Sequence, residues 1–187
     1  LRGKDLRERW SRRALLGVTA GGMAGLLGGC GFRPLYAPGG QSAAAGATRE
    51  ELASVQVALI PERSGQLLRR TLQHRLGSGY GVTPRYDLRA ALQIGVEQEG
   101  FRRDGAATRS RYVVTAPWQL YTAAVPPVLV ASGAETSADA WNLPDNQFFA
   151  ADVASEAAQR RLIDLISNDI VEKVAIALSS QAAGRSA

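Results

Sequence analysis

The chain has 187 residues and a mass of 19.8 kDa, which suits one domain with an appendage and excludes two full domains. A hydrophobic share of 45% and a charged share of 21% exclude a wholly disordered chain. The single Cys excludes an internal disulfide framework, and one Cys with one His leaves almost nothing for a zinc site.

The excess positive charge lies at the start of the chain. Residues 1–13 hold six basic and two acidic side chains, whereas the rest holds sixteen basic and fifteen acidic ones. A body this close to neutral lacks the basic surface of a nucleic-acid-binding protein, so no nucleic-acid partner is expected. Residues 14–27 are uncharged and apolar, and at about 1.5 Å per residue they are too short to span a hydrocarbon core of about 30 Å. This pattern predicts a secretory signal over residues 1–29.

The predicted signal ends in a segment that resembles a bacterial lipobox, made of Leu27, Gly28, Gly29 and Cys30. In that interpretation the Cys30 thiol is the lipid attachment site and Cys30 becomes the mature N-terminus. The alternative is a structural Cys buried in a Gly-rich loop. Gly31 follows where an Asp would retain such lipoproteins at the inner membrane, so the resemblance implies passage to the outer membrane. Residues 11–16 resemble the twin-arginine export signature, with a plain basic signal as the alternative.

The tether and the first folded elements follow the lipobox. Residues 30–48 are predicted to form the lipidated N-terminus and a flexible linker, because most of the segment is small and polar. The folded domain is expected over residues 49–180. Alternation over residues 55–59 predicts a strand that Pro61 ends. A helix is predicted from Gly65 to Leu76, with Ser64 as N-cap and Gly77 just past its end.

Three further strands and a long helix are predicted beyond this helix. Alternation over residues 87–97 is the clearest strand signal, and a turn over residues 100–107 leads into a second alternating run that ends near Leu120. Pro126 and Pro127 open a shorter strand over residues 128–136. Residues 137–149 are expected to be irregular, residues 152–179 helical and residues 181–187 a disordered tail. We expect Leu72, Leu92 and Ile170 to be buried.

The predicted order β-α-β-β-β-α indicates an α+β two-layer sandwich, in which two helices cover a four-stranded, mainly antiparallel sheet. The sequence has no Gly-x-Ser-x-Gly motif and no Gly-rich loop that ends in Lys-Ser or Lys-Thr. His74 is expected to face solvent, about 240° round its helix from the apolar stripe. We therefore expect no enzymatic activity, no cofactor and no metal site.

The segment Cys30-Gly-Phe-Arg-Pro-Leu-Tyr36, followed by this β-α-β-β-β-α body, resembles the LptE family of lipopolysaccharide-assembly lipoproteins. Weaker matches are residues 60–69 and the pair Trp141-Asn142. The resemblance implies an outer-membrane lipoprotein on the periplasmic face that plugs and helps to assemble an LptD-type β-barrel and contacts lipopolysaccharide. The alternatives are an auxiliary lipoprotein of an ABC-type lipid transporter and a structural envelope lipoprotein that binds only proteins.

Two groups of side chains are candidates for these contacts. Four arginines in and after the predicted turn are the candidates for contact with lipopolysaccharide: Arg102, Arg103, Arg109 and Arg111. We expect Asp104 to be the only acidic side chain that opposes them. The alternative is a solvated hairpin tip. Four aromatic residues are the candidates for the partner barrel: Phe101, Trp141, Phe148 and Phe149. The alternative for the last three is that they close the edge of the domain itself.

Overall fold

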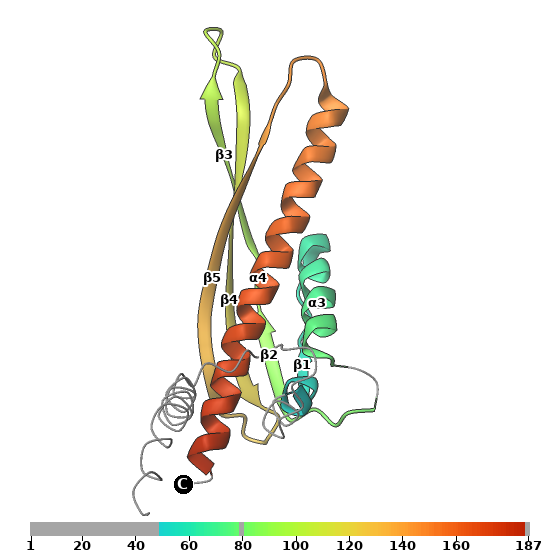
Figure 1. Cartoon of the computed structure of the whole chain (residues 1–187), viewed down its shortest axis with the longest axis vertical. Coiled ribbons are helices and arrows are strands. Elements are labelled where there is room, and N and C mark those ends of the chain that lie inside the picture. Colours follow the sequence, from blue (N-terminus) through green and yellow to red (C-terminus); the bar gives the residue numbers. More distant parts are fainter. Residues whose placement is uncertain (1–48, 79–80, 186–187) are drawn as a thin grey trace, which may run out of the picture. The chain divides into compact units, whose positions relative to one another are not determined.

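The computed structural model describes residues 49–78 and 81–185. The predicted signal, the tether and the lipobox residues Leu27, Gly28, Gly29 and Cys30 lie outside this part of the chain. A helical turn over residues 49–53 precedes the main elements. These are β1 (Val55–Val57), α3 (Glu62–Leu76), β2 (Tyr86–Ala90), β3 (Gln93–Phe101), β4 (Ala107–Thr122), β5 (Leu129–Asn142) and α4 (Phe148–Arg185), as Figure 1 shows.

The long strand β4 organises the sheet. β5 pairs with β4 along one edge, while β2 and β3 pair one after the other along the opposite edge. These pairings are antiparallel, and β1 pairs in parallel with β2. The α+β class and the mainly antiparallel sheet are therefore confirmed, but the sheet has five strands instead of the expected four.

The extra strand arises because the alternating run over residues 87–97 is divided at Ala91 and Leu92. Both halves keep the same register against β4. The Ala91 N–H donates to the Pro117 carbonyl at 3.0 Å, but Pro117 has no N–H to return the hydrogen bond. The ladder is interrupted there, and Leu92 is half-buried instead of lying in the core.

The core lies between one face of the sheet and the two helices. α3 contributes its stripe Leu68, Leu72 and Leu76, and α4 contributes residues at a spacing of four that are fully buried: Leu162, Ile166, Ile170, Val174 and Leu178. The burial of Leu72 and Ile170 is confirmed. α3 ends at Gly77 as predicted, in a left-handed conformation with φ of 69°, but its N-cap is Pro61 and not Ser64.

The helices cover only part of the sheet. On β3, Ile94 packs against the core, whereas Val96, two residues further along the same face, is 60% exposed. α4 starts before the predicted residue 152 and continues to Arg185, so residues 181–185 are helical and not part of a disordered tail. β5 continues to Asn142 into the span that we expected to be irregular. No described helix combines the length and the apolar composition that a membrane crossing requires.

The strand directions define two ends of this body. The base consists of residues 49–54, 81–86 and 123–129, where β1, β2 and β5 begin and β4 ends. The tip consists of residues 99–109 and 141–153, which contain the β3–β4 turn and the start of α4. The 16 residues of β4 cover about 50 Å at about 3.4 Å per residue. The tip and the base are therefore separated by most of the length of β4.

Candidate interaction site at the tip

The turn between β3 and β4 is closed by its own backbone and by Asp104. The Arg102 N–H donates to the Ala106 carbonyl at 2.9 Å, and the Ala106 N–H donates to the Asp104 carboxylate at 3.1 Å. This hydrogen bond from Ala106 lowers the pKa of the Asp104 carboxyl, with a further contribution from Arg102. The turn therefore presents a carboxylate that stays ionised at neutral pH.

Three of the four candidate arginines form ion pairs. Arg102 pairs with Asp104, with a distance of 3.4 Å between Nε and Oδ1, and also with Asp145 from the β5–α4 loop. Arg109 and Arg111 share the Glu99 carboxylate, at 3.6 Å from Arg109 and 3.3 Å from Arg111. The expectation that only Asp104 opposes the cluster is wrong, because Glu99 and Asp145 also neutralise it.

The strand register explains how these charges are distributed. Glu99 lies directly opposite Arg109 in the β3–β4 ladder, and Arg111 lies two residues further along the same face. Their face of the sheet is the one that the helices leave open, since the alternate position Val114 belongs to the core on the opposite face. Arg103 lies in the turn and forms no ion pair with any described residue. The four arginines thus form two pairs, one in the turn and one on the open face.

The aromatic candidates differ in exposure. Phe101 is 61% exposed at the end of β3, and Phe148 and Phe149 are 80% and 81% exposed in the first turn of α4. Trp141 is half-buried on β5, where its ring centroid lies 4.3 Å from that of Tyr112. Trp141 therefore packs partly against the domain itself, whereas the three Phe side chains extend into solvent.

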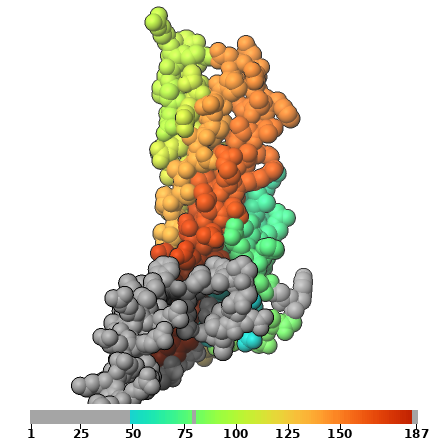
Figure 2. Space-filling view, viewed as in Figure 1, coloured from blue at the N-terminus to red at the C-terminus, as the bar shows by residue number. Residues whose placement is uncertain are grey.

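A groove of about 560 Å³ separates the hairpin turn from the start of α4. Figure 2 shows these two segments beside each other at one end of the body, and the Arg102–Asp145 pair joins them. The groove is lined by charged and apolar side chains, among them Arg102, Asp104, Leu143, Asp145 and Phe148. The groove can hold a ligand or a partner segment that combines charge with apolar surface.

Two acidic residues of this site, Glu99 and Asp145, were not predicted from the sequence. The pairing of Glu99 with Arg109 was accessible in principle, because it follows from the register of a hairpin whose turn had been located. The pairing of Arg102 with Asp145 spans 43 residues and carries no local signal. Among the described residues there is no group of three or more His, Cys, Asp or Glu side chains that could hold a metal ion.

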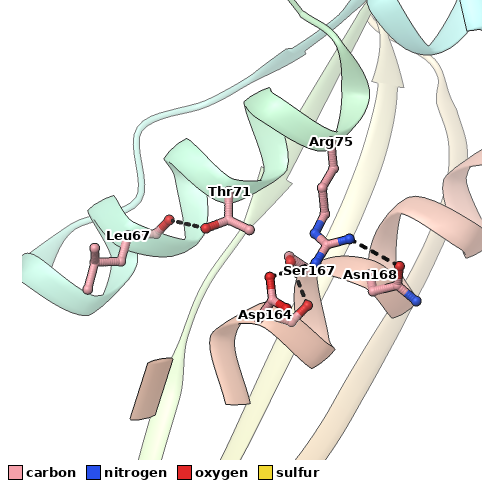
Figure 3. A network of polar contacts seen from close by, with 6 residues as sticks. All are labelled: Leu67, Thr71, Arg75, Asp164, Ser167 and Asn168. Atoms are coloured by element: carbon pink, nitrogen blue, oxygen red, sulfur yellow. Dashed lines mark hydrogen bonds and ion pairs between the residues drawn. The ribbon is translucent and has the colours of Figure 1, made fainter. Parts of the chain in front are cut away.

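A second polar network lies at the junction of the two helices (Figure 3). From α3, Arg75 donates to Asp164 of α4 at 2.6 Å and to Asn168 at 3.3 Å. The Ser167 hydroxyl donates to the Asp164 carbonyl at 2.8 Å, which satisfies it within α4. These hydrogen bonds run between side chains of α3 and α4, so the network joins the two helices. His74 is exposed on the same helix, as predicted.

Comparison with known proteins connects this fold to one family. The family model LptE, described as lipopolysaccharide-assembly, matches residues 52–177. No curated protein sequence matches the chain at a significant level.

The solved structures that are similar to the body include three lipoproteins. A putative lipoprotein from Caulobacter crescentus is 20% identical, with a TM-score of 0.57 over 70% of this chain and 95% of that one. Rare lipoprotein B from Shewanella oneidensis is 9% identical, with a TM-score of 0.52 over 68% and 97% of the two chains. A minor lipoprotein from Acinetobacter baumannii is 15% identical, with a TM-score of 0.50 over 66% and 92%. At these identities the similarity shows the fold alone.

Proposed function

The chain belongs to the LptE family of lipopolysaccharide-assembly proteins, and from that premise we propose that it is an outer-membrane lipoprotein that occupies and helps to assemble an LptD-type β-barrel. It contacts lipopolysaccharide as that lipid passes to the outer leaflet. The observation that carries the proposal is the extent of the family match, since residues 52–177 include all five strands, α3 and most of α4. The role is binding and not catalysis, and it needs no cofactor.

The exposed aromatic side chains of the tip are the proposed barrel contacts. Phe148 and Phe149 extend from the first turn of α4, and Phe101 extends from the end of β3. Aromatic side chains contribute strongly to protein interfaces once they are desolvated, and none of the three is needed for the core of this body. Trp141 presents only the part of its ring that Tyr112 leaves open, so we expect a smaller contribution from it.

The arginines of the tip are the proposed lipopolysaccharide contacts. Lipopolysaccharide offers phosphates next to acyl chains, and a guanidinium group binds a phosphate through two parallel hydrogen bonds. Arg103 is available without breaking an ion pair among the described residues. Arg109 and Arg111 share Glu99, but exposed ion pairs contribute only about 0–1 kcal/mol, so a phosphate can displace that carboxylate. Phe101 supplies apolar surface at the same end.

The membrane anchor is proposed at Cys30, outside the described residues. Each buried CH₂ of an acyl chain contributes about 0.8 kcal/mol, so a lipoprotein with several chains is released slowly. Gly31 in place of Asp supports transfer to the outer membrane. The body then lies on the periplasmic face of that membrane, joined to it through the linker that precedes residue 49.

Extraction of the tagged chain from its host in mild detergent tests this function. We expect the chain to purify as a stable complex with an outer-membrane barrel. A chain that is released from the outer membrane as a monomer would contradict the barrel role. Purification with an inner-membrane ATP-binding transporter would support the alternative role as a transporter auxiliary protein. Retention of the barrel by a variant with the four tip arginines changed to Ser would separate the barrel contacts from the lipopolysaccharide contacts.

A further inference from the structure

The β4–β5 loop at the base is apolar throughout. Residues 123–129 read Ala-Ala-Val-Pro-Pro-Val-Leu, without one charged or hydrogen-bonding side chain. Val125 is 97% exposed, Val128 59% and Leu129 49%. We propose that this loop inserts into the surface of the phospholipid leaflet that holds the acyl chains of Cys30, as a second membrane contact. The inference rests on the lipid anchor of the proposed function.

The ends of the loop are fixed, so its exposed side chains are held outward. The Thr122 N–H donates to the Val128 carbonyl at 2.9 Å, and the Val128 N–H donates to the Thr122 hydroxyl at 2.9 Å. The Ala123 N–H donates to the Arg85 carbonyl at 2.8 Å. A loop that is already ordered loses little conformational entropy on insertion, so most of the gain from burying its apolar surface is retained.

The same hydrogen bonds place the loop beside the point where the chain enters the body. Arg85 forms an ion pair with Glu51 of the first helical turn, at 3.6 Å, and its N–H donates to the Ser54 carbonyl. Eighteen residues separate Cys30 from Arg49. A flexible linker of that length has a root-mean-square reach of about 24 Å, so an acylated Cys30 keeps the base close to the leaflet.

The chemistry of the loop fits a lipid surface better than a protein partner. Protein interfaces depend on Trp, Tyr and Arg anchors and on directional hydrogen bonds, and residues 123–129 supply neither. Tyr121, opposite Leu129 in the β4–β5 ladder, lies under the guanidinium of Arg89 with 4.7 Å to the ring centroid. An aliphatic loop bordered by Tyr and Arg matches the gradient from acyl chains to headgroups.

Quenching by labelled lipids measures the insertion directly. The full-length lipidated chain carries Val125→Cys labelled with an environment-sensitive fluorophore, in vesicles of phosphatidylethanolamine and phosphatidylglycerol that contain acyl-chain nitroxide lipids. A second preparation carries the label at Val153→Cys, since Val153 is 53% exposed at the tip. We expect strong quenching at 125 and none at 153. Replacing phosphatidylglycerol with phosphatidylcholine should leave the quenching unchanged, because insertion uses apolar surface.

A matched pair of variants tests the side chains themselves. Val128→Ser should reduce the fraction of inserted label by about tenfold, because burial of one Val side chain accounts for a change of that order, whereas Val153→Ser should leave it unchanged. A chain that floats with the vesicles while its label at 125 remains unquenched would overturn the loop inference and retain the anchor. A chain that does not float would overturn the anchor and the inference together. A photoreactive residue at 125 that forms a protein adduct in cells would also overturn the inference.

Discussion

The indole of Trp118 lies over Gly133, which is its direct partner on β5. A Cβ at position 133 would lie 2.9 Å from Cζ2 of the indole and 3.0 Å from Nε1, so only glycine accommodates the ring there. The indole N–H donates to Glu135 on the same strand at 3.2 Å. Trp118 is 4% exposed, so this contact fixes a large side chain at the centre of the sheet.

Gly133→Ala should therefore destabilise the fold by about 1–3 kcal/mol, as overpacking of a close contact does. Gly95→Ala is the matched control in a neighbouring strand, since its Cβ would lie 3.6 Å from the Val113 carbonyl, an ordinary contact distance. Urea unfolding of both variants measures the effect. Equal free energies of unfolding for the two variants would contradict the packing of Trp118 against Gly133.

The core prediction distinguishes buried from half-buried apolar residues. Ile170→Ala should lower the free energy of unfolding by about 2–5 kcal/mol, because Ile170 is fully buried. Leu92→Ala should cost less than half of that, because Leu92 lies at the break between β2 and β3 and is half-buried. The midpoints of urea titrations compare the two. A larger loss for Leu92→Ala would mean that the helices extend over the β2–β3 break.

The shared carboxylate of Glu99 makes a specific prediction for lipopolysaccharide binding. Glu99→Gln should raise the affinity for purified lipopolysaccharide by up to about fivefold, since it frees Arg109 and Arg111 from ion pairs worth up to about 1 kcal/mol. Changing the four tip arginines to Ser should weaken the binding and reduce its dependence on salt. Glu172→Gln on the exposed face of α4 is the control for net charge. Equal gains for both Gln variants would assign the effect to overall charge.

The partner prediction concerns the first turn of α4. A photoreactive residue in place of Phe148 or Phe149 should crosslink to the barrel in cells, because both side chains are more than three-quarters exposed. The same substitution at Leu165, which is 54% exposed in the middle of α4, shows whether the barrel is contacted only at the tip. No adduct at Phe101, Phe148 and Phe149 would remove these side chains from the interface.

The anchor prediction concerns Cys30. A Cys30→Ala chain should remain at precursor size or become soluble, because it has no thiol to accept the lipid. Membrane fractionation and the apparent mass of the chain measure the outcome. A Cys30→Ala chain that fractionates as a mature membrane protein would show that the segment Leu27-Gly28-Gly29-Cys30 is not a lipobox.

The sequence by itself determined the features that depend on local spacing. A period of two located β2, β3 and the second half of β4, and a spacing of four located the buried stripe of α4, because one face of each element must meet the core. The C-terminal end of α3 followed from Gly77, since a left-handed residue there favours glycine. The candidate lipid site at Cys30 was also predicted from the local sequence alone, and it remains a prediction.

The tertiary structure decided the features that depend on pairing between distant segments. Residues 137–142 lack the alternating large apolar side chains that mark a strand, and they form one because β4 offers them a continuous hydrogen-bonding partner. The single run over residues 87–97 became two strands because Pro117, some twenty residues later, cannot donate to Ala91. Pairing between distant segments also gave Arg102, Arg109 and Arg111 the partners Asp145 and Glu99, which local sequence did not indicate. Local periodicity determines which face of an element is buried. The partner of each backbone or charged group depends instead on which distant segment the fold brings next to it.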